Sequence, residues 1–131
     1  MLIRPRVLLA DDHSPLLEAA TELLRPHFDV VGTALDGEGL VSEALRLKPD
    51  VIVVDITMPI LNGIDAVQRL LKSGSTAKFI FLTIHSSEEF ITACREAGAL
   101  GFVSKSKMKG HLIPAIYAAL DNTPYVSSPS R

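Results

Sequence analysis

The chain has 131 residues, of which 47% are hydrophobic and 21% charged, a composition typical of one compact domain rather than a disordered segment. The net charge of -2 provides no basic surface for nucleic acid, and no apolar run reaches the roughly 18 residues needed to span a membrane. The single cysteine, Cys94, excludes an internal disulfide. Because no signal-peptide pattern is present either, we expect a cytoplasmic protein.

The first half of the chain alternates short apolar runs with amphipathic segments. Three runs rich in Val, Leu and Ile predict strands at residues 6–10, 28–34 and 51–55. Apolar residues at helical spacing predict one helix that begins near Ser14 and ends before Pro26, and a second over residues 38–47. The run Val51–Val54 is continuously apolar, which is typical of a parallel strand buried on both faces.

The second half of the chain repeats this alternation. Residues 57–63 predict a loop, and a helix follows from Ile64 to Leu71. Strands are expected over residues 78–83 and 100–104, separated by a helix that Ser86 or Ser87 caps and Gly98 ends. A last helix is expected over residues 109–120.

Alternating strands and helices with short connections predict an α/β fold of the (βα)5 type. Such a chain forms a doubly wound, five-stranded parallel sheet with helices on both faces. We expect the domain to cover residues 1–121, and residues 122–131, with two prolines and three serines, to form a tail or linker.

Polar side chains follow four of the five predicted strands. These are Asp11 and Asp12, Asp55, Thr83 and Lys105. Because the carboxyl ends of parallel strands meet at one edge of a sheet, we expect these groups to converge. Three neighbouring carboxylates repel one another, and a hard divalent cation such as Mg²⁺ relieves that repulsion. Together with a lysine and a hydroxyl, the cluster favours phosphoryl transfer, with Asp55 as the nucleophile.

These strand ends also carry recognisable motifs. They are Leu-Ala-Asp-Asp-His at 9–13, Val-Asp-Ile-Thr-Met-Pro-Ile-Leu-Asn-Gly at 54–63, Phe-Leu-Thr at 81–83 and Gly-Phe-Val-Ser-Lys at 101–105. In this set and order, the chain resembles the receiver domain of bacterial two-component response regulators from Val7 to about Val126. The resemblance implies a flavodoxin-like sheet of strand order 2-1-3-4-5.

The resemblance also implies roles for residues of the metal site. Asp12 is expected to bind Mg²⁺ directly and Asp11 mainly through water, with Asp55 and the Thr57 backbone carbonyl completing the set. Asp55 is expected to be phosphorylated by a histidine kinase or a small phosphodonor. Thr57 and His85 occupy positions that vary among receivers and are associated with the rate of dephosphorylation.

A second group of residues is expected to respond to the phosphoryl group. Lys105 is expected to contact the phosphoryl oxygens, and Thr83 to move toward them. Phe102 matches the aromatic residue that rotates inward behind this threonine. The phosphoryl group, with a charge of about −2, would thereby shift the equilibrium between two conformations of a surface of the domain.

The resemblance is nearest to receivers that precede a C-terminal helix-turn-helix of the LuxR type, an output domain absent from this sequence. The expected function is therefore control of transcription within a longer parent protein. This chain itself is expected to contact DNA only through such an output domain, and to bind no membrane. It has two candidate homodimer surfaces, one formed by the first and last helices and the other by helix 4, strand 5 and helix 5.

Two other functions are compatible with parts of the sequence. A Mg²⁺-dependent phosphohydrolase with an aspartyl nucleophile commonly needs a carboxylate two residues later, where this chain has Thr57. A receiver-like interaction module that is never phosphorylated is disfavoured by the complete residue set. We expect a signalling module rather than an enzyme. The four histidines are expected at the surface, because no pair has metal-ligand spacing beside carboxylates.

Overall fold

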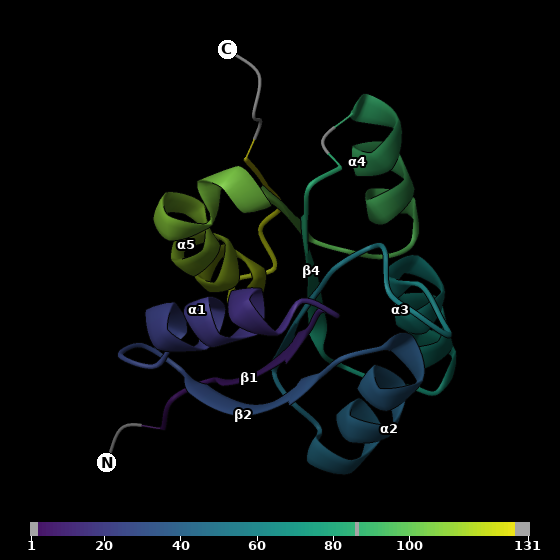
Figure 1. The fold of residues 1–131 in the computed structure, drawn as a ribbon, viewed down its shortest axis with the longest axis horizontal. Helices are drawn as coiled ribbons and strands as arrows, with labels where there is room; N and C mark the ends of the chain where they lie inside the picture. The colour runs from purple at the N-terminus through teal and green to yellow at the C-terminus, as the bar shows by residue number, and fades with distance from the viewer. Residues whose placement is uncertain (1–2, 86, 128–131) are drawn as a thin grey trace.

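The computed structural model describes residues 3–85 and 87–127. Strands and helices alternate along the chain (Figure 1). The strands are β1 (Arg6–Ala10), β2 (Asp29–Ala34), β3 (Val51–Val54), β4 (Lys78–Thr83), β5 (Gly101–Ser104) and β6 (Tyr125–Val126). The helices are α1 (Ser14–Leu24), α2 (Gly37–Leu47), α3 (Gly63–Lys72), α4 (Glu88–Glu96) and α5 (Met108–Leu120), the last preceded by a 3₁₀ turn at Lys105–Lys107.

All strands lie in one parallel sheet of order β2-β1-β3-β4-β5-β6. The order of the first five strands, 2-1-3-4-5, is confirmed. The sheet extends one strand further than expected, because Tyr125 and Val126 pair with Gly101 and Phe102 of β5. A two-residue strand carries no hydrophobic periodicity, so only backbone pairing with a distant strand reveals it.

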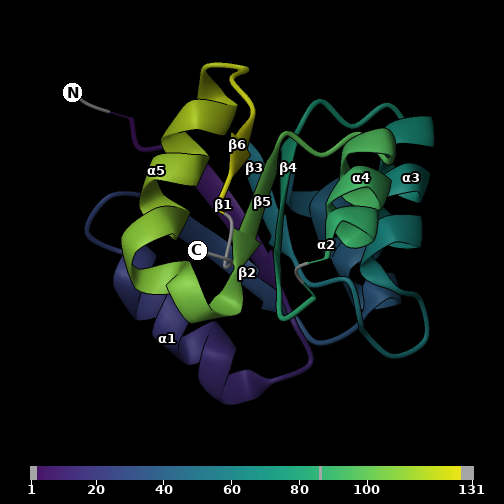
Figure 2. The same ribbon diagram turned by 90° about the horizontal axis from the view of Figure 1, so that it is seen from above.

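The core consists of two apolar layers, one on each face of the sheet. Figure 2 shows α1 and α5 on one side of the sheet and α2, α3 and α4 on the other. Alternate residues of the buried strand β3 supply both layers: Val51 and Val53 pack toward α1 and α5, whereas Ile52 and Val54 pack toward α2 and α3. Burial on both faces explains why this strand is apolar without alternation. None of the helices in the described part of the chain is long and apolar enough to cross a membrane.

The loop between β3 and α3 contains a strained residue. Ile60 has φ 71°, a left-handed conformation that β-branched residues avoid, and it is 77% exposed. The Leu61 N–H donates to the Pro59 carbonyl at 2.7 Å, which closes a three-residue γ-turn around Ile60. Because the Ile60 side chain is mostly exposed, its packing contacts do not offset the backbone strain at this position.

We expect Ile60→Gly to raise the free energy of unfolding by about 1 kcal/mol, since relief of the positive φ outweighs the added freedom of glycine in the unfolded chain. Urea denaturation measures the change as a higher midpoint at an unchanged slope. Ile60→Ala is the matched control, because alanine keeps a Cβ at the same φ. A glycine variant less stable than the alanine variant would refute the strain argument.

Candidate phosphoryl and metal site

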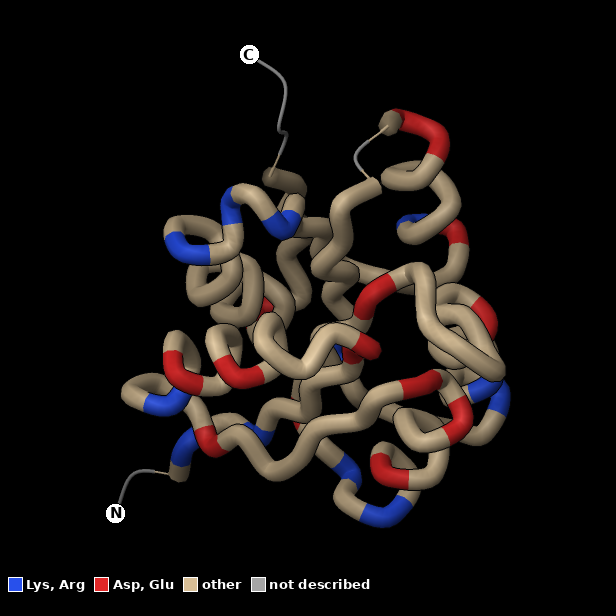
Figure 3. Tube along the Cα trace, in the orientation of Figure 1, with Lys and Arg blue, Asp and Glu red and all other residues tan. Residues whose placement is uncertain are grey.

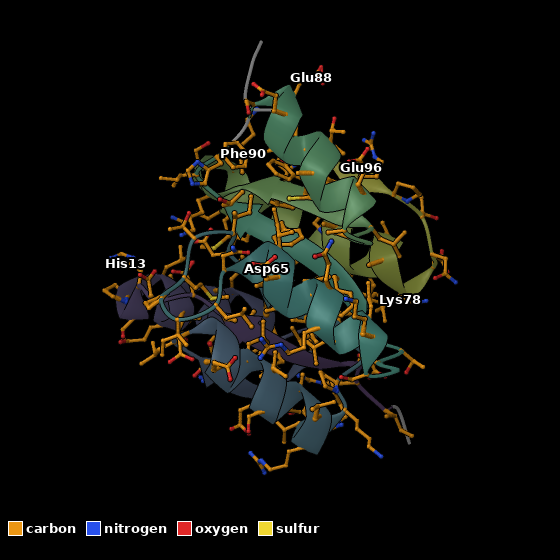
Figure 4. All side chains as sticks on the ribbon, turned by 90° about the vertical axis from the view of Figure 1, so that its right-hand side faces the viewer. His13, Asp65, Lys78, Glu88, Phe90 and Glu96 are labelled. Atoms are coloured by element: carbon orange, nitrogen blue, oxygen red, sulfur yellow. The ribbon has the colours of Figure 1, made fainter. Side chains whose placement is uncertain are left out.

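The carboxyl ends of four strands converge at one edge of the sheet. Asp11 follows β1, Asp55 follows β3, Thr83 ends β4 and Lys105 follows β5. Figure 4 labels one residue near each end of the strands. His13, just beyond β1, lies at the carboxyl ends, where the site is, and Lys78, the first residue of β4, lies away from them. The parallel register thus brings together residues from distant parts of the sequence.

The three predicted carboxylates form a cluster. Asp11, Asp12 and Asp55 each offer an oxygen within 4.8 Å of the others. Asp11 and Asp55 are buried, with 2% and 5% exposed, while Asp12 is exposed at the rim. Two buried acids beside a third acid create a strongly negative pocket, which requires a cation for stability.

Lys105 provides one positive charge to this pocket. Its Nζ lies 2.8 Å from Asp11 Oδ2 and 3.1 Å from Asp55 Oδ2. Burial by itself lowers the pKa of Lys105, but hydrogen bonds and charge attraction from the two aspartates outweigh it, so the pKa is raised above its usual value. The lysine therefore remains charged throughout the physiological pH range.

The Asp11 carboxylate is only partly satisfied. Its Oδ1 accepts a hydrogen bond from the His13 N–H at 2.9 Å. Its Oδ2 pairs with the Lys105 ammonium at 2.8 Å and has no further partner among the described residues. Burial raises the pKa of Asp11, and the Asp55 charge adds to the rise, against the opposing effects of Lys105 and the His13 amide.

The three clustered carboxylates, with Lys105 as the one partner of Asp11 Oδ2 among the described residues, fit a hard cation. The pocket offers only carboxylate oxygens, two buried and one exposed, which suit Mg²⁺ better than the softer metals that prefer nitrogen and sulfur ligands. A cation there would satisfy Oδ2 and reduce the repulsion among the three acids. Thr57 is exposed in the loop after β3, and the role of its backbone carbonyl as a ligand remains a prediction.

We expect Asp11→Asn to stabilise the metal-free protein by on the order of 1 kcal/mol at neutral pH, because burial and the Asp55 charge disfavour the charged form of Asp11, and Lys105 keeps Asp55 as its partner. The pKa of Asp11 is higher in the folded protein than its unfolded value of 3.8. As the pH falls toward 3.8, the folded protein therefore takes up a proton on Asp11 before the unfolded chain does, and the stability of the wild-type protein rises. The advantage of the variant should therefore shrink on acidification. Urea denaturation at several pH values without Mg²⁺ tests this, and a gap that widens at low pH would contradict it.

The loop that holds Asp55 depends on a close backbone approach. The Gly63 N–H donates to the Ile56 carbonyl at 2.7 Å, and a Cβ at Gly63 would lie 1.9 Å from the Asp55 carbonyl oxygen. Asn62 then caps α3 by accepting from the Asp65 N–H at 2.9 Å. The Asn-Gly pair of the sequence motif thus closes the loop and fixes the position of Asp55.

The ends of β4 and β3 are joined by His85, whose contact with Thr57 was not predicted from the sequence. Thr83 is fully buried, and its Oγ1 accepts from the His85 N–H at 3.2 Å. His85 Nε2 shares a hydrogen bond of 3.0 Å with Thr57 Oγ1, and its ring stacks on Phe90 at 4.4 Å. His85, expected at the surface, is in fact half-buried. Its position two residues after Thr83, like that of Thr57 after Asp55, was the available signal.

The remaining sequence-predicted residues lie around this cluster. Phe102 is buried at 2% exposure and packs in the core layer on the side of α2, α3 and α4. Ser87 caps α4 by accepting from the Phe90 N–H at 3.4 Å, whereas the alternative cap, Ser86, lies outside the described residues. Figure 3 shows where the acidic and basic positions lie along the trace.

Comparison with known proteins agrees with this geometry. Residues 7–117 match the family model described as the response regulator receiver domain. The chain is 34% identical to the transcriptional regulatory protein LiaR of Bacillus subtilis over 94% of its own length and 59% of LiaR. It is 33% identical to the response regulator GacA of Pseudomonas viridiflava over 93% of its length and 58% of GacA.

A solved structure shows the same fold. The chain superposes with a TM-score of 0.89 on a two-component response regulator of the LuxR family from Aurantimonas sp., at 32% identity, covering 96% of this chain and 91% of that one. The chain spans 59% of LiaR, 58% of GacA and 52% of DegU from Brevibacillus brevis, which is little more than half the length of these relatives.

Proposed function

This chain belongs to the response regulator receiver domain family, and on that premise we propose that it is a signalling module in which Asp55 accepts a phosphoryl group. The phosphodonor is a sensor histidine kinase or a small acyl phosphate. The observation that carries the proposal is the Lys105 ammonium, which touches Asp55 Oδ2 at 3.1 Å and Asp11 Oδ2 at 2.8 Å in a buried acidic pocket.

The residues account for the transfer step as follows. An Asp55 carboxylate oxygen forms a bond to phosphorus while the bond from phosphorus to the nitrogen or oxygen of the donor breaks. The donor atom keeps the electron pair of the broken bond. The Ile56 N–H donates to Asp55 Oδ1 at 2.7 Å, which orients the carboxylate, and Lys105 lies beside the other oxygen. Positioning and charge neutralisation of this kind supply most of the catalysis in phosphoryl transfer.

Asp11, Asp12 and Asp55 would hold Mg²⁺, with the Thr57 backbone carbonyl as a further ligand. When bound, Mg²⁺ supplies positive charge that offsets the negative charge of the phosphoryl group. The acidic cluster, in which two of the three carboxylates are buried, supports this assignment.

Phosphorylation is proposed to act through Thr83 and Phe102. Thr83 is buried at the end of β4, and its hydroxyl would exchange its contact with the His85 amide for one with a phosphoryl oxygen. Phe102 lies on the neighbouring strand, three residues before Lys105. A new dianionic group that recruits Thr83 and Lys105 would shift the surface formed by α4, β5 and α5.

The output is proposed from the relatives. LiaR and DegU are named transcriptional regulatory proteins, and both extend well beyond the region matched here. We place the domain in a cytoplasmic parent protein that controls transcription, in which an additional output domain contacts DNA. The two candidate homodimer surfaces are α1 with α5, and α4 with β5 and α5.

Two alternatives predict different results. A phosphohydrolase would turn over a generic aryl phosphate, although Thr57 stands where its acid/base carboxylate is needed and its hydroxyl already contacts His85. A module that is never phosphorylated would fail to bind Mg²⁺. The buried Asp11 and Asp55 beside the half-buried Lys105 favour the phosphoacceptor over both.

Beryllofluoride, a mimic of the phosphoryl group, tests the proposal without requiring a kinase. When beryllofluoride is added, the amide NMR signals of Asp55, Thr83 and Lys105 are expected to shift in the presence of Mg²⁺ and to stay in place in EDTA. Asp55→Asn should remove the response. The absence of binding by wild-type protein in Mg²⁺ would overturn the phosphoacceptor function.

A further inference from the structure

The C-terminal strand β6 lies beside the strand that carries the lysine of the site. The Tyr125 N–H donates to the Leu100 carbonyl at 3.0 Å, and the Ser127 N–H donates to the Phe102 carbonyl at 2.9 Å. The hydroxyl of Ser127 also accepts from the Ser104 N–H at 2.9 Å, and Ser127 is only 2% exposed. This buried side chain therefore continues the hydrogen-bond ladder one step beyond the end of β6.

Ser104 occupies a central position in this arrangement. On one side it pairs with Thr83 of β4, and on the other its N–H is held by Ser127. The next residue is Lys105, whose Nζ reaches the buried carboxylates of the site. The backbone from which Lys105 extends is thus fixed by β4 and by the segment that contains β6.

The β6 segment is also anchored to α5 and lies near α4. Tyr125 Oη shares a hydrogen bond of 2.7 Å with His111 Nδ1 of α5. Val126 and Phe102 border the same small void of about 10 Å³, together with Ile91 and Cys94 of α4. Figure 2 shows β6 next to β5, between α5 and α4. The β6 residues that make these contacts lie beyond residues 7–117, which the family model matches.

We propose that Ser127 is a positioning residue for Lys105. With β6 docked, the Ser127 hydroxyl fixes the Ser104 backbone and so directs Lys105 toward the phosphoryl group on Asp55. The proposal rests on the proposed function of the site. Because coupling between two sites is reciprocal, a ligand that engages Lys105 also strengthens the docking of β6, so that the C-terminal segment responds to phosphorylation.

Substitution of Ser127 separates this role from general stability. Ser127→Ala is expected to bind beryllofluoride roughly tenfold more weakly, because one buried amide loses its acceptor. Its affinity for Mg²⁺ should not fall, since Ser127 does not touch the carboxylates. Ser127→Thr, which retains the hydroxyl, should restore beryllofluoride binding. Thr123→Ala removes an exposed hydroxyl from the same segment and should match wild type.

Amide hydrogen exchange of the wild-type protein provides a test without substitution. Beryllofluoride with Mg²⁺ is expected to slow exchange at Ser104 and Ser127 relative to Mg²⁺ alone. Unchanged exchange, or a Ser127→Ala variant with wild-type beryllofluoride affinity, would overturn the proposal. A Ser127→Ala variant that also binds Mg²⁺ more weakly would overturn the proposal too, because that loss indicates that the whole site has become less ordered. Failure of wild-type protein to bind beryllofluoride would instead refute the phosphoacceptor function itself.

Discussion

Lys105→Met should form the phosphorylated protein about 100-fold more slowly than wild type when acetyl phosphate is the donor. The ammonium touches Asp55 Oδ2 at 3.1 Å, so its loss removes the positive charge nearest to the incoming phosphoryl group. Methionine retains the length and apolar stem of the side chain. The initial rate of adduct formation, followed by intact-mass spectrometry, measures the effect.

The same substitution should strengthen Mg²⁺ binding, because the acidic cluster loses its internal counter-charge. Opposite changes in phosphorylation rate and Mg²⁺ affinity distinguish a lost charge from a damaged pocket. Lys109→Met is the matched control, since Lys109 is exposed in the first turn of α5. Phosphorylation of Lys105→Met at the wild-type rate would contradict the role of the lysine.

Asp12→Asn should weaken Mg²⁺ binding on the order of 100-fold, by removing one anionic ligand from a site with few others. Asp12 is exposed, so the free energy of unfolding should change by less than about 0.5 kcal/mol without metal. The metal effect is thereby isolated from folding, which distinguishes this variant from Asp11→Asn. Calorimetric titration with MgCl₂ measures the affinity.

Asp29→Asn is a suitable control for that titration. Asp29 is an exposed acid at the start of β2, at the edge of the sheet away from the site. Its loss changes the net charge of the protein by the same amount. Equal Mg²⁺ affinity in Asp12→Asn and wild type would remove Asp12 from the ligand set.

The sequence predicted the strands and the acidic cluster because both follow from local pattern and topology. The apolar run Val51–Val54 indicated a strand buried on both faces, and Asp55 at its end indicated a group at the mouth of the sheet. Once parallel order is assumed, Asp11 and Asp12 must lie beside Asp55, as they do. The roles of these residues in phosphorylation and Mg²⁺ binding stay predictions.

The features that sequence reasoning missed depend on contacts between distant residues or on backbone geometry. Thr57 and His85 are 28 positions apart, and their hydrogen bond arises only after β3 and β4 pair. Ser127 meets Ser104 across 23 positions through a strand too short to show a pattern. The positive φ of Ile60 is imposed by the surrounding loop, whereas local preference alone argues against it.

The central claim is that Asp55 is the phosphoacceptor, and intact-mass spectrometry after incubation with acetyl phosphate and Mg²⁺ tests it most directly. The expected result is one added phosphoryl group on wild-type protein, absent in EDTA and absent from Asp55→Asn. The asparagine side chain has nearly the same size as that of aspartate but lacks the nucleophilic carboxylate. An adduct that persists in Asp55→Asn would contradict the assignment, as would a wild-type protein that neither acquires a phosphoryl group nor binds beryllofluoride.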